Sequence, residues 1–279
     1  MPIHDQGYRR YSGGKAPRGY GWAVITRAGL RTLIAKRAFL GLLLLSWFPF
    51  FVRAVQMYAA ANLPQAAFLK PTASTFRDFL GQQDIFAFFI TVYVGAGLIA
   101  NDRRANALQI YLSKPLTRAE YVFGKLAILM SFLLLVTWVP AILLLIVQIA
   151  FAGNFTFFQN NAYLFPAITL FTFLDVTMVA TAMLALSSLS KSSRYVGILY
   201  AAVIFFTQAV YGVLFAVTRS TAFSWVSFPA SLTQVGDAIF RLPLKYSTPW
   251  PVSLLMIVGL IAVSALVLER RVRGVEVVA

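Results

Sequence analysis

Six stretches of the chain are apolar over about 20 residues or more, and polar segments separate them. A bilayer core about 30 Å thick needs about 20 apolar residues in a helix, and unbroken runs of this length favour helices over barrel strands. The pattern therefore predicts an all-α, polytopic membrane protein with six transmembrane helices. The predicted spans are residues 38–60, 79–100, 126–151, 162–189, 195–217 and 250–268.

Two of these spans contain a proline near the middle. Pro49 lies in the first span and Pro140 in the third. Proline lacks the backbone N–H that an α-helix uses and crowds the preceding turn, so we expect a kink at each position.

Composition and charge narrow the class of protein further. Hydrophobic residues make up 59% of the 279 residues, charged residues 12%, and cysteine is absent. A soluble nucleic-acid-binding protein would need a more polar surface, and a secreted disulfide scaffold would need cysteines. The net charge of +15 must therefore be accommodated outside the lipid core.

The basic residues gather on one side of the predicted spans. Eighteen of the 24 Lys and Arg residues lie before the first span, between spans two and three, between spans four and five, or after the sixth. Basic loops stay in the cytoplasm, so both termini are expected there. Residues 1–20 contain no apolar run and are expected to form a basic cytoplasmic tail rather than a cleaved signal. Residues 21–270 then form the transmembrane domain, and 271–279 a second tail.

The segment 22–37 before the first span has a moderately amphipathic helical pattern. Its arginines Arg27 and Arg31 point away from a side that carries Trp22, Ile25, Leu30, Leu33 and Ile34. The pattern predicts an N-terminal helix lying in the membrane interface. The alternative is that these residues only form the basic flank that orients the first span.

The segment between spans two and three is the most informative part of the sequence. Residues 102–112 favour a helix with Asp102 near its start, where the helix dipole favours an anion, and with an apolar face. Pro115 ends that helix, and Thr117 with Glu120 forms a capping box that starts the next one. A short, rigid helix closed by a proline turn is more than a connector needs, so we expect it to contact a partner. The alternative is that it packs only on its own bundle.

At these residues the chain resembles the permease subunits of ABC transporters, specifically the ABC-2 exporter type. The layout resembles that class over about residues 20–270, and a specific motif covers about 25 of them. Residues that match the motif are Asp102, Arg103, Leu108, Leu112, Ser113, Pro115, Thr117, Arg118, Tyr121, Gly124 and Lys125. The chain departs from it at Asn106 and Ala107, where many members carry Gly-Thr or Gly-Ser.

The resemblance implies a mechanism and a set of partners. Residues 102–112 would form a coupling helix seated on a separate P-loop ABC ATPase, which would bind the ATP and Mg, with the loop around Lys191 and Arg194 as a second contact. The implied ATPase-coupling residues are Asp102, Arg103, Arg104, Asn106, Leu108, Gln109, Tyr111, Leu112, Lys191 and Arg194, with Pro115, Thr117 and Glu120 shaping the turn. A second permease copy or homologue would complete an export pathway in a bacterial-type inner membrane, without any nucleic-acid partner.

Within the chain itself the sequence offers no catalytic or metal site. Gly14-Lys15 and Gly124-Lys125 are followed by Ala16 and Leu126, so neither fits the P-loop pattern G-x-x-x-x-G-K-[ST]. The single histidine, His4, lies in the tail. We therefore expect a subunit without its own ATPase activity, cofactor or metal.

Asp175 is the only ionisable residue deep within a clearly predicted span. A charge at mid-bilayer costs about 2.5–3.5 kcal/mol on insertion scales unless it is satisfied. Three interpretations stay open: a pair with a group of a partner subunit, a polar substrate or proton route, or a neutral side chain hydrogen-bonded within the bundle. Thr172 and Ala182 share its helical face.

The segments on the opposite side from the tails are also predicted to be partly helical. Residues 219–249 are long for a bare loop, and Pro229 could open a helix there, so we expect a short helix pair. Another short helix is expected within 61–84.

Two other functions compete with an ABC permease. An ion-coupled secondary transporter would use Asp175 and be driven by a pH gradient without ATP. A non-transporting membrane scaffold would form a stable complex without an ATPase subunit.

Overall fold

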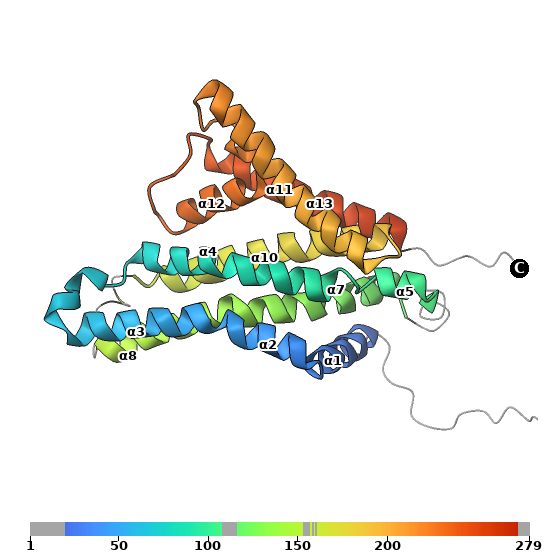
Figure 1. Ribbon diagram of the computed structural model, residues 1–279, viewed down its shortest axis with the longest axis horizontal. Coiled ribbons are helices and arrows are strands. Elements are labelled where there is room, and N and C mark those ends of the chain that lie inside the picture. Colours follow the sequence, from blue (N-terminus) through green and yellow to red (C-terminus); the bar gives the residue numbers. More distant parts are fainter. Residues whose placement is uncertain (1–19, 108–115, 153–156, 158, 160, 273–279) are drawn as a thin grey trace, which may run out of the picture.

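The computed structural model describes residues 20–107, 116–152, 157, 159 and 161–272, and within these residues it is a bundle of helices without strands (Figure 1). Six helical segments are long and apolar enough to cross a membrane, which confirms the six predicted spans. They cover Arg37–Asn62, Ala73–Arg104, Arg118–Ala152, Leu164–Leu189, Ser193–Thr218 and Trp250–Arg271. Most ends lie within about three residues of the prediction, but the second span starts six residues earlier and the third eight.

The first and third spans are each broken shortly before their proline. The two halves are α2 (Arg37–Ser46) and α3 (Phe48–Asn62) in the first span, and α7 (Arg118–Val136) and α8 (Trp138–Ala152) in the third. The breaks fall at Trp47 and Thr137, two and three residues before Pro49 and Pro140. Because a proline has no N–H to donate to the carbonyl four residues earlier, the helix cannot continue regularly there. The structure thus confirms both predicted irregularities.

The second span is interrupted in its last third. It consists of α4 (Ala73–Ile90), a π-helical turn η2 (Thr91–Gly95) and α5 (Ala100–Arg104). Ser187 of α10 (Leu164–Leu189) bridges the gap: its Oγ accepts from the Ile99 and Ala100 amides at 3.1 and 3.0 Å and donates to the Ala96 carbonyl at 2.9 Å. The fourth span therefore supplies hydrogen-bond partners that the distorted helix lacks.

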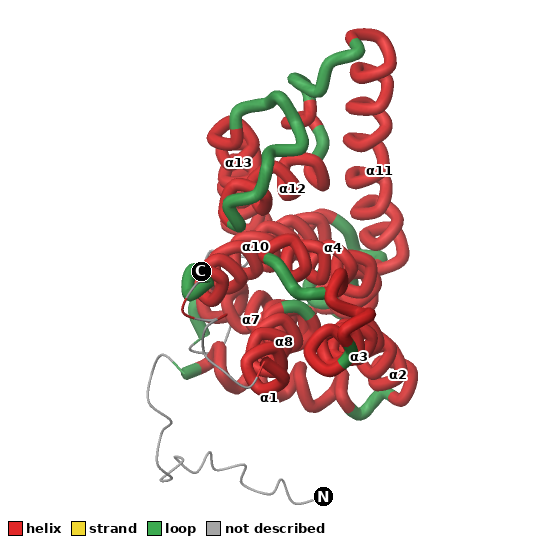
Figure 2. The backbone as a smooth tube through the Cα atoms, turned by 90° about the vertical axis from the view of Figure 1, so that its left-hand side faces the viewer, coloured by secondary structure: helices red, strands yellow, loops and turns green. Residues whose placement is uncertain are grey.

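The spans differ strongly in how far the protein itself buries them. In the most apolar part of α10, 61% of the residues are buried, against 11% for α11 (Ser193–Thr218). Both views show α11 leaning away from the remaining bundle, and Figure 2 shows α12 (Phe228–Ile239) between α11 and α13 (Trp250–Arg271) (Figures 1 and 2). A groove between α10, α11 and α13 follows from this arrangement and is described below.

Four short elements accompany the spans. They are α1 (Gly21–Ile34), the 3-10 turns η1 (Pro64–Leu69) and η3 (Ser224–Val226), and α12 (Phe228–Ile239). Each falls in a segment for which the sequence predicts a short helix, and Pro229 occupies the first turn of α12 as expected. The placement of α1 in a membrane interface stays a prediction.

Helix α1 packs on α7 through two glycines. A Cβ atom at Gly29 would overlap the Ile128 side chain, and one at Gly124 would lie 3.0 Å from the Trp22 carbonyl oxygen. The Thr26 hydroxyl donates to the Gly124 carbonyl at 3.2 Å. The absence of side chains at these two positions lets the helices approach closely.

We expect Gly124→Leu to separate α1 from α7 and to destabilise the protein by about 1–3 kcal/mol, because the contact has no space for a larger side chain. Gly41→Leu is the matched control, since nothing lies within 4 Å of a Cβ at Gly41. Thermal unfolding of both variants in detergent measures the difference. Equal melting temperatures would contradict this account of the contact.

The predicted topology can be tested because the chain contains no cysteine. Ala105 and Leu244 are exposed; Ala105 follows α5 and Leu244 lies in the loop between α12 and α13, and Figure 1 shows α5 and this loop at opposite ends of the bundle. In intact cells a membrane-impermeant maleimide should label Leu244→Cys and leave Ala105→Cys unlabelled until the cells are lysed. The reverse pattern would place the termini outside the cytoplasm.

Candidate functional site

Asp102 lies at the centre of a polar cluster that joins α5 to α7. Its Oδ2 accepts a hydrogen bond from the Tyr121 hydroxyl at 2.7 Å and lies 2.7 Å from the Lys125 Nζ. Tyr121 and Lys125 are one helical turn apart, so both face the same carboxylate. The Tyr121 side chain is fully buried. The Asp102 carboxylate is thus engaged within the chain.

Arg103, the next residue, joins α5 to α10. Its guanidinium donates to the Ser188 carbonyl in the last turn of α10. The last four carbonyls of a helix have no partner within it, so this contact satisfies one of them. Asp102 and Arg103 together connect the end of the second span to the third and fourth spans.

The structure corrects the predicted start of the coupling helix. Asp102 lies in the last turn of the second span, and α5 ends at Arg104. Asn106 has a φ of 52°, in the left-handed region, where a right-handed helix cannot continue. Asp102 does lie in the first turn of a helix, as predicted, but that helix is α5, which is interrupted before Asn106 instead of running on without a break. The ion pair with Lys125 adds to any stabilisation by the helix dipole. Leu108, Gln109, Tyr111, Leu112 and Pro115 lie outside the described residues.

The turn into the third span has the predicted capping box. The Thr117 Oγ1 accepts from the Glu120 amide at 3.2 Å, and the Glu120 Oε2 accepts from the Thr117 amide at 2.9 Å. Two N-terminal amides of α7 are satisfied in this way, which fixes where the helix begins.

Other predicted coupling residues lie at the surface of this end. Arg104, Asn106, Lys191 and Arg194 are exposed. Lys191 lies in a tight turn in which the Ser190 Oγ accepts from the Ser192 amide at 3.1 Å. We call the exposed Arg104, Lys191 and Arg194 the basic face. None of these three cations forms an ion pair with another residue that the structure describes, whereas Asp102 and Arg103 are engaged internally.

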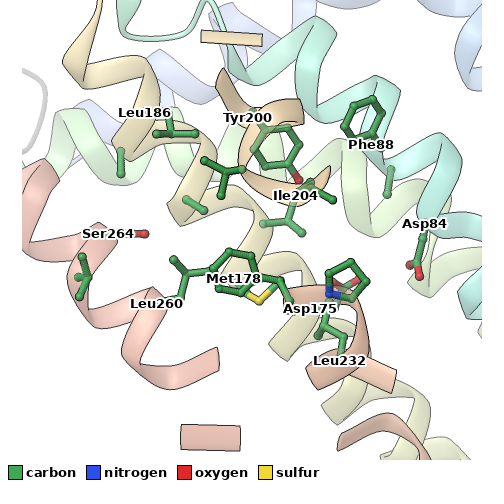
Figure 3. A pocket seen from close by; sticks show the side chains of 18 of the residues that line it. Asp84, Phe88, Asp175, Met178, Leu186, Tyr200, Ile204, Leu232, Leu260 and Ser264 are labelled. Carbon is green, nitrogen blue, oxygen red and sulfur yellow. The ribbon is translucent and has the colours of Figure 1, made fainter. Parts of the chain in front are cut away.

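A second polar region lies inside the bundle, around Asp175 of α10. Asp175 is 7% exposed and has no hydrogen bond or ion pair with any described residue. Asp84 of α4 faces the same cavity of about 320 Å³ (Figure 3). Each is the twelfth residue of its helix, about 17 Å along it at 1.5 Å per residue, so each lies well inside its span.

This arrangement corrects the expectation that Asp175 is the only ionisable residue deep in a span. The second span begins at Ala73, so Arg77 and Asp84 also lie within it. Polar residues before Ile85 lower the mean hydropathy of this part of the span, so a search for apolar runs does not find it. The buried residues of α4 nevertheless recur with helical spacing, at Phe76, Phe79, Leu80, Gln83, Ala87 and Ile90. That periodicity is the signal by which the longer helix could have been found.

Arg77 is buried beside this cavity and has partners on two other helices. Its Nε lies 3.6 Å from Oδ1 of Asp237 in α12, and its guanidinium carbon lies 4.7 Å from the centre of the Phe171 ring. A Cβ at Gly236 would collide with the guanidinium, so the glycine makes the contact possible. Burial raises the pKa of Asp237, while the charges of Arg77 and Lys245 lower it.

Among the described residues, no group of three or more His, Asp or Glu side chains could hold a metal ion. The first region is a basic end of the bundle, where Asp102 and Arg103 are bonded to neighbouring helices. The second is a mostly apolar cavity lined by Asp84, Asp175 and Arg77.

The family model described as ABC-2 family transporter protein matches residues 23–271, which is most of the chain. The chain belongs to this family. It is a multi-pass ABC transporter permease of the ABC-2 type, a class of membrane subunit that is generally not catalytic by itself and typically works with an ATPase subunit. A search of curated proteins found no match.

In this ABC-2 permease we expect Lys125→Met to be more destabilising than the double variant Asp102→Asn with Lys125→Met. The single change leaves a half-buried carboxylate without its cation, at a cost of about 1–3 kcal/mol, and the second change removes that charge. Thermal unfolding of the two single variants and of the double variant gives the coupling energy between Asp102 and Lys125. Arg104→Met, on the same helix but exposed, is the control, and strictly additive effects would contradict the ion pair.

Proposed function

We propose that this chain is the permease subunit of an ABC exporter. With a second permease, either a copy of itself or a homologue, it forms the substrate pathway in a bacterial-type inner membrane. A separate P-loop ATPase binds ATP and Mg and drives the transport cycle. Membership of the ABC-2 family supports this assignment, because members typically work with an ATPase subunit.

The main observation in support of the proposal is that the end of α5 is bonded to both α7 and α10. Asp102 is bonded to Tyr121 and Lys125 of α7, and Arg103 to Ser188 of α10. A displacement of this end is therefore transmitted to the second, third and fourth spans together. Coupling between distant sites requires such packed and bonded elements, since a flexible connection transmits no difference between states.

The basic face is the part of this end that we assign to the ATPase. Arg104, the turn that carries Lys191 and the start of α11 with Arg194 come from the two segments for which the sequence predicts ATPase contacts. Exposed cations guide association with an oppositely charged surface and set the salt dependence of binding. The complementary surface of the ATPase is therefore acidic.

The second permease is inferred from the exposed spans. In their most apolar parts, the first span and α11 are each only 11% buried within the chain. A pathway for a substrate cannot be enclosed by helices of which two contribute so little to the bundle. A second permease packed on one of these faces, with lipid on the rest, completes the enclosure.

Reversal of charge on the basic face should weaken ATPase binding. We expect Arg104→Glu with Lys191→Glu to lower affinity for the ATPase at least about tenfold, because opposed charges become like charges. Lys70→Glu with Arg219→Glu makes the same change of charge at the opposite end and should have no effect. Co-purification with ATPase subunits of the same genome, followed by ATP-dependent transport in vesicles, measures both steps.

Three outcomes would contradict the proposal. Equal ATPase binding by both charge-reversed variants would remove the assignment of the basic face. Transport driven by a pH gradient without ATP, and lost in Asp175→Asn, would indicate an ion-coupled transporter. A stable native complex that contains no ATPase would indicate a scaffold.

A further inference from the structure

The groove between the fourth, fifth and sixth spans has an almost entirely apolar lining and an acidic end. Its volume is about 320 Å³, and α4 and α12 close it near the two carboxylates (Figure 3). Met178, Ile204, Leu260 and Leu186 are among the apolar side chains along its walls. Phe88 and Tyr200 form an aromatic wall, with ring centres 5.7 Å apart in a stacked arrangement.

Asp175 is the residue of this groove that most clearly lacks a partner. It is 7% exposed, lines the cavity and has no hydrogen bond or ion pair with any described residue. Buried carboxylates in proteins are otherwise hydrogen-bonded or paired, because an unpaired one is costly to bury. Asp84 lines the same cavity, at an equivalent depth on α4.

The cation beside the groove is already engaged elsewhere. Among the described residues that line the cavity, Arg77 is the only positively charged one, and it contacts Asp237 and the Phe171 ring. Arg77 attracts Asp84 and Asp175 as well, but three carboxylates then share one guanidinium. Two carboxyl groups and one guanidinium therefore line a cavity whose other walls are mostly apolar.

We propose that this groove binds a hydrophobic organic cation, with its positive charge at Asp84 and Asp175 and its apolar part against the groove walls. The carboxylates supply the negative counter-charge that the cation does not find in lipid. The Phe88 and Tyr200 rings add cation–π attraction. In the transporter proposed above such a cation would be a transported substrate, so its role rests on that proposal. Its binding does not depend on an ATPase.

The chemistry of the groove favours an organic cation over an inorganic one. Mg²⁺ and Ca²⁺ take six or more oxygen ligands, and two carboxylates in an apolar groove do not provide them. An organic cation with a delocalised or shielded charge loses little hydration energy on entering such a site. It also fills apolar space that a small ion would leave empty.

Equilibrium binding of tritiated tetraphenylphosphonium to the purified full chain in detergent tests this proposal. Methyltriphenylphosphonium serves as a smaller second cation. Tetraphenylborate, which has the shape of tetraphenylphosphonium and the opposite charge, is the competitor control. Asp84→Asn and Asp175→Asn remove each carboxylate while they keep its volume. Asp78→Asn removes an exposed carboxylate from the same helix and is the matched control.

Saturable binding of a phosphonium cation is expected, and tetraphenylborate should not displace it. Asp175→Asn and Asp84→Asn should each weaken binding at least about tenfold, as for the loss of a charge-assisted contact, and Asp78→Asn should bind as the native chain does. Gel filtration shows whether each variant stays folded.

Two results would overturn the proposal. One is the absence of saturable binding by both cations, which would mean that protons or another chain neutralise the carboxylates. The other is equal binding by native chain and both Asp variants, which would mean that the groove recognises apolar shape alone. ATPase association should persist in the Asp variants, so the two proposals fail separately: a native chain that binds the cation but no ATPase would overturn only the proposed ATP-driven export.

Discussion

Backbone amides inside a bilayer need partners, and the second span depends on a side chain from another helix to provide them. Where η2 gives way to α5, the Ser187 hydroxyl of α10 serves the Ile99 and Ala100 amides and the Ala96 carbonyl. Ile99 and Ala100 are fully buried, and unsatisfied buried amides would each cost several kcal/mol, so the distorted helix is stable only with α10 beside it. The position of the α5 end, and of everything bonded to it, follows from this contact.

The same helix connects the two polar regions of the molecule. Along α10 lie Asp175 in the groove, Ser187 at the distortion and Ser188, which Arg103 contacts at the α5 end. The second span runs beside α10 and carries Asp84 at the groove and Asp102 at the α5 end. A physical connection between the groove and the basic face therefore exists in two adjacent helices, which are bonded to each other at the interruption.

The sequence predicted the spans well and the polar contacts poorly, for physical reasons. Long apolar runs and the missing N–H groups of Pro49 and Pro140 act locally, so the six spans and two breaks could be located. The capping box of Thr117 and Glu120 is equally local. By contrast, the partners of Asp102 were not predicted, because the contacts with Tyr121 and Lys125 are set by tertiary packing. Asp84 was missed because α4 is polar at its start and relies on burial against other spans.

The ion pair of Arg77 has a consequence for how the protein is made. Its partners Phe171 and Asp237 lie about 90 and about 160 residues later in the chain. At 5–20 residues per second, Asp237 is synthesised about 8–32 s after Arg77. During that interval the second span enters the membrane with a cation whose final partners do not yet exist, and its long side chain must reach the lipid headgroups instead. The start of α4 can therefore settle into its native depth only when the last third of the chain has been inserted.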